Sequence, residues 1–229
     1  MTVGRGEFGA TRIAWTDASL LELAALEAHE ALDDLGEQQV RRYAALRGIS
    51  ARRFLASRWL VRQLAAELTD HDDLRLVTTC LRCGADYGQP RFATAPVVVS
   101  ISYSGDRAVV AVAPRADASA VGIDIEREPV GDPQHPLTAL APLFAPSTPP
   151  TLREWTLVEA ALKADGRGLN VDLSQVEIEP RASGRAENSR AVRIPGRSAP
   201  VDARAIDGPA GFILSAAMVA AEGPTRHPY

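Results

Sequence analysis

The sequence has few cysteines and no long hydrophobic run, and both absences narrow what the protein can be. Only two cysteines occur among the 229 residues, Cys80 and Cys83, so a framework of disulfides is not indicated. Residues 1–15 lack the apolar core of a signal peptide. The longest apolar stretches, such as residues 211–221, fall short of the roughly 18–20 residues that span a bilayer. We therefore expect a cytoplasmic protein without a membrane partner.

The sequence also has no excess of basic residues. Lysine and arginine total 25 against 29 aspartate and glutamate residues, which gives a formal net charge of −4. A general nucleic-acid binder usually carries a basic footprint, so this balance argues against a nucleic-acid partner. Apolar residues make up 46% and charged residues 24%, as in ordinary globular proteins. The length suffices for one large domain or two small lobes with a buried core.

Acidic residues are missing from one stretch, residues 38–66, which is instead rich in arginine. Its seven arginines are Arg41, Arg42, Arg47, Arg52, Arg53, Arg58 and Arg62. They can form a solvated helix face, with arginine stems covering apolar surface. They can also form an anion site for phosphates, and the segregation of one sign of charge inside an acidic protein speaks for that site. Both interpretations stay open at this point.

Periodicity and turn residues predict helices in the first half and a mixture of strands and helix in the second. Apolar spacing predicts an amphipathic helix over residues 17–35, with Asp17 as N-cap, and a helical region over 36–68 with a break near Gly48. Residues 151–167 form a third helix, because Thr151 and Glu154 make a capping box and glycines follow.

Strands are predicted where β-branched residues gather between turn signals. The predicted strands are residues 97–103, 108–113, 121–126, 176–179 and 212–220; the first two form a hairpin, and residues 180–200 form another. A proline-rich connection over 129–150 should hold one short helical piece near 137–144. This order of elements predicts an α+β fold with largely antiparallel sheets. We expect an N-terminal lobe over 1–118 and a C-terminal lobe over 119–229.

Two carboxylates on the strand over 121–126 are the first candidate for chemistry. Asp124 and Glu126 stand two residues apart, so they share one face of the strand, while Ile123 and Ile125 point to the other. Adjacent carboxylates repel unless a cation lies between them, and oxygen ligands suit magnesium. A solvated pair on a sheet edge is the commoner outcome, so the pair alone does not decide between the two.

A second candidate lies on the helix over 151–167. Trp155, Glu159 and Lys163 are spaced i, i+4, i+8 and share one helical face. Glu159 and Lys163 can form a surface salt bridge worth about 0.5 kcal/mol or less. Alternatively, Glu159 supplies a third carboxylate to the metal and Lys163 neutralises a phosphate, an assembly that would polarise a diphosphate. Trp155 is interpreted as a packing residue.

Five segments together resemble the phosphopantetheinyl transferases of the Sfp type. GIDIE at Gly122–Glu126 and W-x-x-x-E-A-x-x-K-x-x-G-x-G-L at Trp155–Leu169 are similar to the paired signatures of that family. SISYSGDRAVVAVA at Ser100–Ala113 resembles its N-x-S-H-S-G-D segment, and CGADYGQPRF at Cys83–Phe92 its C-G-x-x-H-G-K-P element. The arginine-rich stretch resembles its R-R-F-x-x-x-R-x-x-x-R region.

The resemblance covers roughly residues 37–220 and implies a fold, a reaction and partners. The fold would be a pseudo-twofold pair of α/β lobes with coenzyme A bound between them. The enzyme would move 4′-phosphopantetheine from coenzyme A onto a serine of an acyl or peptidyl carrier protein. The cofactors implied are Mg²⁺ and coenzyme A as co-substrate, and we expect a monomer.

The resemblance also implies roles for individual residues. Asp124, Glu126 and Glu159 would be the magnesium ligands, and Glu159 would be the base that deprotonates the acceptor serine. Lys163 would contact the diphosphate and help the 3′,5′-ADP leave.

Five further residues would contact coenzyme A. Ser102 and Tyr103 fall where the family contacts its phosphates, and Arg53 falls near the adenosine 3′-phosphate. Gln89 and Arg91 belong to the glycine- and proline-containing element. Tyr103 stands where the family usually has histidine and Gln89 where it usually has lysine or arginine. Tyr103 keeps a hydroxyl donor, and Arg91 would face the same side as Gln89 in an extended segment.

Val158 stands where the family usually has lysine, which is a third departure from the family's pattern. Two alternative functions are therefore considered. Each departure removes a potential cation from the supposed phosphate site, where a hydrogen bond to a charged group contributes about 1.5–3 kcal/mol. One alternative is therefore a repurposed homologue with altered or lost coenzyme A use. The other is a non-catalytic carrier-protein binder. It could hold zinc at Cys80 and Cys83, although such a lone C-x2-C pair is more often two reduced thiols in a turn.

Overall fold

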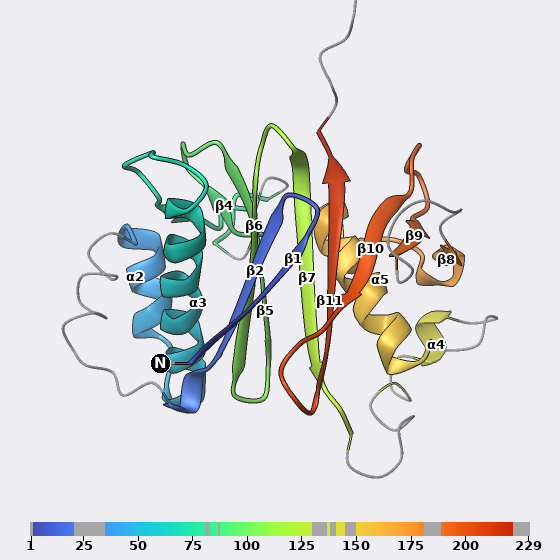
Figure 1. Ribbon diagram of the computed structural model, residues 1–229, viewed down its shortest axis with the longest axis horizontal. Helices are drawn as coiled ribbons and strands as arrows, with labels where there is room; N and C mark the ends of the chain where they lie inside the picture. Colours follow the sequence, from blue (N-terminus) through green and yellow to red (C-terminus); the bar gives the residue numbers. More distant parts are fainter. Residues whose placement is uncertain are drawn as a thin grey trace, which may run out of the picture.

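The computed structural model describes residues 2–20, 35–80, 83–86, 88–129, 137, 141–144, 150–180 and 189–221. Its sheets are antiparallel and its two long helices lie outside them, so the predicted α+β class is confirmed. Two sheets lie side by side in the middle of the molecule, with α3 along one outer side and α5 along the other (Figure 1).

The first sheet and its helices come from the first half of the chain. Its strand order is β1-β2-β6-β5, and all neighbouring strands are antiparallel. The elements are β1 (Val3–Phe8), β2 (Thr11–Asp17), α2 (Glu37–Ala44), α3 (Gly48–Ala66), β5 (Val97–Ser104) and β6 (Arg107–Pro114), with a small separate pair, β3 (Leu76–Val77) and β4 (Arg91–Phe92). Helix α3 buries Leu60 and Leu64 against Val110 and Val112 of β6.

The second sheet and its helix come from the second half. Its strand order is β7-β11-β10-β9-β8, again antiparallel. The elements are β7 (Ala118–Arg127), α4 (Ala141–Phe144), α5 (Leu152–Asp165), β8 (Glu177–Pro180), β9 (Ser189–Arg193), β10 (Val201–Ile206) and β11 (Phe212–Ala220). Leu157 and Leu162 of α5 belong to the buried core on this side.

The two sheets share a third core and a row of serines. Val109 of β6 and Ile123 of β7 are fully buried in one apolar cluster that both sheets supply. Side chains also join β5 to β7: the Ser100 hydroxyl accepts a hydrogen bond from the backbone N–H of Ile123 at 3.1 Å. In the same way, Ser104 accepts from the N–H of Arg127 at 3.0 Å. Every second residue of β5 thus faces β7, as the period of a strand requires.

The predicted elements are mostly confirmed. The break near Gly48 separates α2 from α3, the hairpin is β5-β6, and the third strand is β7. The short helical piece appears as α4, which is four residues long. The last strand is β11.

One helix prediction is wrong at its start, and five strands were not predicted. Asp17 ends β2, and Ala18–Leu20 form a single 3-10 turn, in which the Asp17 carboxylate accepts from the N–H of Ser19 at 2.9 Å. Asp17, which was predicted to cap a helix, therefore stabilises a turn at the end of a strand. The rest of the predicted helix, residues 21–34, lies outside the described residues. The unpredicted strands are β1, β2, β10 and the short pair β3 and β4.

Candidate functional site

Helix α5 touches strand β7 directly at Gly122. A Cβ atom added at Gly122 would lie 1.8 Å from the backbone oxygen of Ala160 and 2.8 Å from the backbone nitrogen of Ala164. No side chain can occupy that position without pushing the helix away. Because the helix and the strand backbones lie so close, side chains of α5 near Ala160 come within reach of those of β7 next to Gly122.

The sequence also fixes where α5 begins and ends. The Thr151 hydroxyl accepts from the N–H of Glu154 at 3.3 Å, and the Glu154 carboxylate accepts from the N–H of Thr151 at 2.8 Å. Gly166 ends the helix in the left-handed conformation, with φ of 85°. The predicted capping box is confirmed, and it sets the face that Glu159 and Lys163 present.

Lys163 reaches across to Asp124 and Ser102. Its ammonium group donates to Asp124 Oδ1 at 2.6 Å, to Ser102 Oγ at 2.9 Å and to the backbone oxygen of Ile123 at 3.0 Å. Ser102 in turn donates to Asp124 Oδ1 at 2.9 Å. Asp124 is only 4% exposed. The pair joins a buried carboxylate to a half-buried ammonium group, and its added hydrogen bonds help to offset the cost of removing the carboxylate from water.

Glu126 and Glu159 complete a cluster of three carboxylates and one ammonium group. Burial raises the pKa of Glu126, and the charge of Asp124 raises it further, against a hydrogen bond from Ser104 at 3.1 Å. Burial likewise raises the pKa of Glu159; Lys163 opposes this increase, and the charges of Asp124 and Glu126 add to it. The structure therefore brings together the four residues that the sequence selected, Asp124, Glu126, Glu159 and Lys163.

The donor set of this cluster suits a divalent cation, but its present arrangement holds a lysine. Asp124 Oδ2 is buried and has no hydrogen-bond partner among the described residues. Carboxylate oxygens are hard ligands, and a cation would relieve their mutual repulsion. In the part of the chain that the structure describes, however, no three His, Cys, Asp or Glu side chains are grouped closely enough to hold a metal ion. The magnesium site stays a prediction, with Asp124, Glu126 and Glu159 as its ligands.

Tyr103 and Arg53, two of the predicted coenzyme A contacts, lie on the α3 side of β5. The Tyr103 hydroxyl lies 2.7 Å from Ser57 Oγ and accepts from Arg58 at 3.1 Å. Arg53 donates to the backbone oxygen of Gly105 at 2.9 Å, and its guanidinium carbon lies 5.6 Å from the centre of the Tyr103 ring. The two residues are thus neighbours, while Ser102 points to the carboxylates.

Gln89 and Arg91 line a pocket next to the end of α5. The pocket has a volume of about 580 Å³, and its walls come from the segment before β4 and from the residues that follow Lys163. The lining residues are Thr79, Cys80, Gly88, Gln89, Pro90, Arg91, Asp165, Gly166, Arg167 and Asn170. Gln89 also donates to the backbone oxygen of Lys163 at 2.5 Å. The pocket therefore lies at the C-terminal end of α5, and none of Asp124, Glu126, Glu159 and Lys163 lines it.

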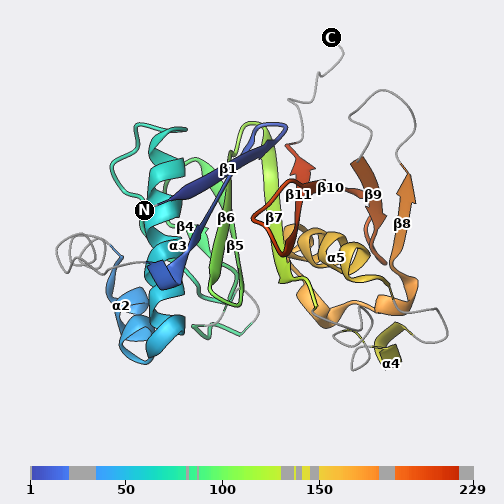
Figure 2. The same ribbon diagram turned by 60° about the horizontal axis from the view of Figure 1, so that its bottom comes forward.

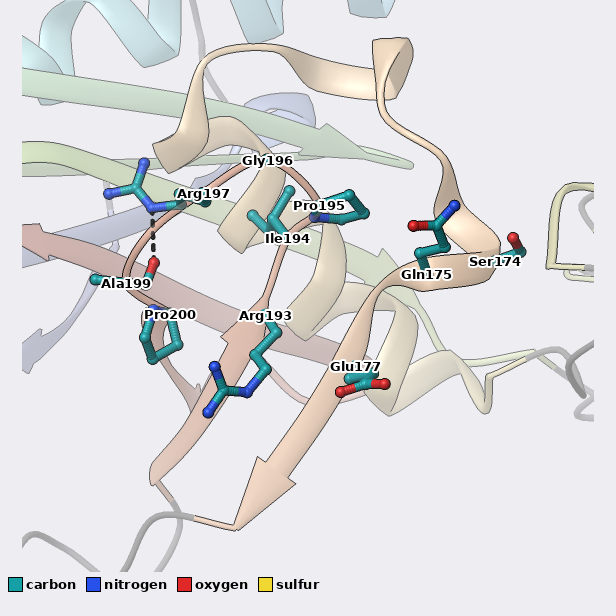
Figure 3. Close-up of a pocket in the computed structure, with 10 residues that line it drawn as sticks. All are labelled: Ser174, Gln175, Glu177, Arg193, Ile194, Pro195, Gly196, Arg197, Ala199 and Pro200. Carbon is teal, nitrogen blue, oxygen red and sulfur yellow. Dashed lines mark hydrogen bonds between the residues drawn. The ribbon is translucent and has the colours of Figure 1, made fainter.

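A second pocket lies on the second sheet and contains none of the predicted site residues. Figure 3 shows its lining, in which Arg197 donates to the backbone oxygen of Ala199 at 3.1 Å. Its volume is about 430 Å³. Arg197 also pairs with Asp165 at 3.3 Å, so this pocket and the one beside Gln89 meet at the same carboxylate.

Cys80 and Cys83 lie in a tight turn. The N–H of Cys80 donates to the backbone oxygen of Ala85 at 2.7 Å, and the N–H of Gly84 donates to that of Cys80 at 2.8 Å. Neither cysteine forms a disulfide, Cys80 is half-buried and Cys83 is exposed. The turn that a lone C-x2-C pair suggested is present.

Three site residues were not singled out from the sequence: Ser57, Arg58 and Ser104. Arg58 was one of the seven arginines, but nothing distinguished it from the others. Serines at 100, 102 and 104 repeat with the period of a strand, and this repeat was the available signal for a polar row on one face of β5.

Comparison with known proteins adds no family assignment. No protein-family model matches the chain, and a search of curated proteins finds no relative. Among the described residues, no helix combines the length and apolar character needed to cross a membrane.

Proposed function

We propose that the protein is a phosphopantetheinyl transferase with the two-lobed fold of the Sfp type. It would transfer 4′-phosphopantetheine from coenzyme A to a serine of an acyl or peptidyl carrier protein. The observation that carries the proposal is the contact between Lys163 of α5 and Asp124 of β7 at 2.6 Å. Glu126 and Glu159 share the electrostatic environment of that pair.

The reaction would use Glu159 and Lys163 of the cluster in different steps. Glu159 takes the proton of the acceptor serine, and its raised pKa makes it a stronger base than an exposed carboxylate. The serine oxygen attacks the β-phosphorus of coenzyme A in line, a new phosphorus–oxygen bond forms, and the bond to the bridging oxygen breaks. Lys163 neutralises charge on the diphosphate as 3′,5′-ADP leaves.

A divalent cation would sit with the three carboxylates. Asp124, Glu126 and Glu159 would hold Mg²⁺, and the unpartnered Asp124 Oδ2 is the oxygen that such an ion would satisfy. When bound, Mg²⁺ supplies Lewis-acid polarisation of the diphosphate. Lys163 would then give up Asp124 and turn to the substrate.

The direct test is mass spectrometry of an apo carrier protein incubated with the enzyme, coenzyme A and magnesium. A mass gain of one phosphopantetheine arm on several carrier proteins supports the proposal. A protein that neither transfers the arm nor binds coenzyme A in calorimetry would contradict it.

One observation favours a repurposed homologue as the second candidate. Ser102, Tyr103 and Gln89, which were expected to meet coenzyme A, are all hydrogen-bonded to other parts of the protein. A changed ligand would explain why these side chains have intramolecular partners. Coenzyme A binding without transfer to any carrier protein would favour this candidate over the first.

A further inference from the structure

Arg58 is a buried cation whose partners among the described residues are neutral. It is 3% exposed and lies over the ring of Phe54, with its guanidinium carbon 4.0 Å from the ring centre. Its Nε and Nη2 donate to Gln39 Oε1 at 3.2 and 2.7 Å. Its Nη1 donates to Ser57 Oγ at 2.9 Å and to the Tyr103 hydroxyl at 3.1 Å. Burying a charge without an opposite charge is costly unless its donors are hydrogen-bonded. The guanidinium group of Arg58 meets this condition through its hydrogen bonds, and these hold the group in one geometry.

Hydrogen-bond accounting shows which way the Tyr103 proton points. The Ser57 hydroxyl donates to the backbone oxygen of Phe54 at 2.7 Å. A hydroxyl has one hydrogen, so Ser57 can only accept from Tyr103, and Tyr103 is the donor of their 2.7 Å contact. The Tyr103 oxygen accepts from Arg58 at the same time. The phenol is therefore held through both its donor and its acceptor, and its proton is directed at α3.

This accounting corrects one expectation. The sequence suggested that Tyr103 keeps a hydroxyl donor for a phosphate in place of the usual histidine. That donor is engaged by Ser57, so Tyr103 can offer a phosphate no hydrogen bond without breaking an existing one. Its contribution to the site must come from its position.

Tyr103 lies between the two serines that hold the carboxylates of β7. Neighbouring residues of a strand point to opposite faces, so Tyr103 faces α3 while the serines face β7. Ser102 donates to Asp124 at 2.9 Å, and Ser104 donates to Glu126 at 3.1 Å. Fixing the Tyr103 ring therefore fixes the stretch of backbone from which both serines project.

We propose that Arg58 is a positioning residue: through the Tyr103 hydroxyl it holds the end of β5, whose two serines orient the carboxylates of β7. The inference rests on the proposed transferase function for its catalytic consequence. Arg58 touches neither substrate nor reacting atoms. A side chain buried in the first lobe thereby sets the geometry of acidic groups in the second.

The test compares Tyr103→Phe, Arg58→Met and the double variant in the carrier-protein assay. Misplacement of catalytic groups by about 1 Å can cost roughly 100-fold in rate, so each single variant should lower kcat by about 10- to 100-fold. KM for coenzyme A should change by less than about 3-fold, because the effect is on geometry and not on binding. The double variant should be no slower than the slower single variant, since both break the same link.

Two matched controls separate this link from general damage. Tyr43→Phe removes a hydroxyl from another tyrosine of the first lobe, one that stacks on Phe54. Arg12→Met removes an exposed arginine that pairs with Glu7. Both should keep the wild-type kcat. Additive losses in the double variant, or a Tyr103→Phe enzyme with full activity, would overturn the proposal.

Amide chemical shifts measure the same link without any substrate. In Tyr103→Phe and Arg58→Met, the amide signals of Asp124 and Glu126 should move relative to those of the controls. Should the wild type show no transfer while these signals still move, the proposed function fails and the positioning role stands. Unmoved signals in Tyr103→Phe would overturn the positioning role, even where Arg58→Met does not fold.

Discussion

The two long helices, α3 and α5, occupy corresponding places but reach their sheets by different means. Each lies on the outer side of one sheet (Figure 2). Helix α5 touches β7 backbone to backbone at Gly122, and a lysine then meets an aspartate directly. Helix α3 reaches the end of β5 through a side-chain contact: Arg58 of the helix donates to the hydroxyl of Tyr103 on the strand.

The difference separates the side of the molecule that carries the charged groups from the side that carries the hydroxyl groups. The close contact of α5 with β7 brings Lys163 to Asp124, and burial raises the pKa values of Glu126 and Glu159 nearby. The β7-facing side of β5 supplies the hydroxyls of Ser102 and Ser104, which donate to Asp124 and Glu126. In the proposed reaction, the second lobe would hold the reactive groups and the first lobe would position them.

The strongest way to break the comparison is to separate α5 from β7. Gly122→Val places atoms where the backbone of Ala160 lies, so we expect a loss of about 3 kcal/mol in the free energy of unfolding and loss of transfer. Urea denaturation measures the free energy of unfolding, and the carrier-protein assay measures transfer. Ser119→Val, at an exposed position of the same strand, should change this free energy by less than about 0.5 kcal/mol. Equal stability of the two variants would mean that the contact at Gly122 is unimportant.

The next change removes a reactive group and leaves the packing alone. Glu159→Gln should lower the rate of transfer by about 100- to 10,000-fold, the usual contribution of a general base, while the protein stays folded. The rate follows from mass spectrometry of the carrier protein, and circular dichroism monitors the fold. Glu177→Gln, at an exposed position of β8, is the control and should keep full activity. A fully active Glu159→Gln enzyme would remove Glu159 as base.

The raised pKa values of Glu126 and Glu159 predict how stability depends on pH without metal. Their carboxyl groups hold protons more tightly in the folded than in the unfolded state. Their stabilising contribution is therefore complete below the unfolded pKa of about 4.5 and is lost as pH rises through the folded values. With a chelator present, the free energy of unfolding should decrease as pH rises from the unfolded to the folded pKa values. The Glu159→Gln variant should show a smaller decrease. An unchanged slope in Glu159→Gln would show that Glu159 ionises normally.

The smallest expected effects concern the helix starts. Thr151→Ala removes the cap of α5 and should cost about 1 kcal/mol, with transfer retained. Helix α3 begins at Arg47, which has an extended backbone and makes no side-chain cap bond, so Arg47→Ser should stabilise by up to about 1 kcal/mol. Thermal unfolding measures the stability of both variants. Equal shifts of the midpoint temperature in the same direction would contradict the assignment of caps.

Most local structure could be predicted from local patterns. The capping box of Thr151 and Glu154, the turn at Gly105 and the strand β7 each depend on residues close in the chain. The strand β1 was not predicted because its sequence, VGRGEF, contains two glycines, and glycine is uncommon in strands. Strand β2 also pairs with β6, about 95 residues further on, and pairing across such a distance leaves little local signal.

The sequence by itself determined which residues could carry chemistry: two carboxylates on one strand face, and a glutamate and a lysine on one helix face. Only the tertiary structure decided what they meet. Lys163 finds Asp124 across 39 residues of chain, and Tyr103 finds Arg58 across 45. Side-chain periodicity is a local property of backbone geometry, whereas each of these hydrogen bonds depends on how a helix packs against its own sheet.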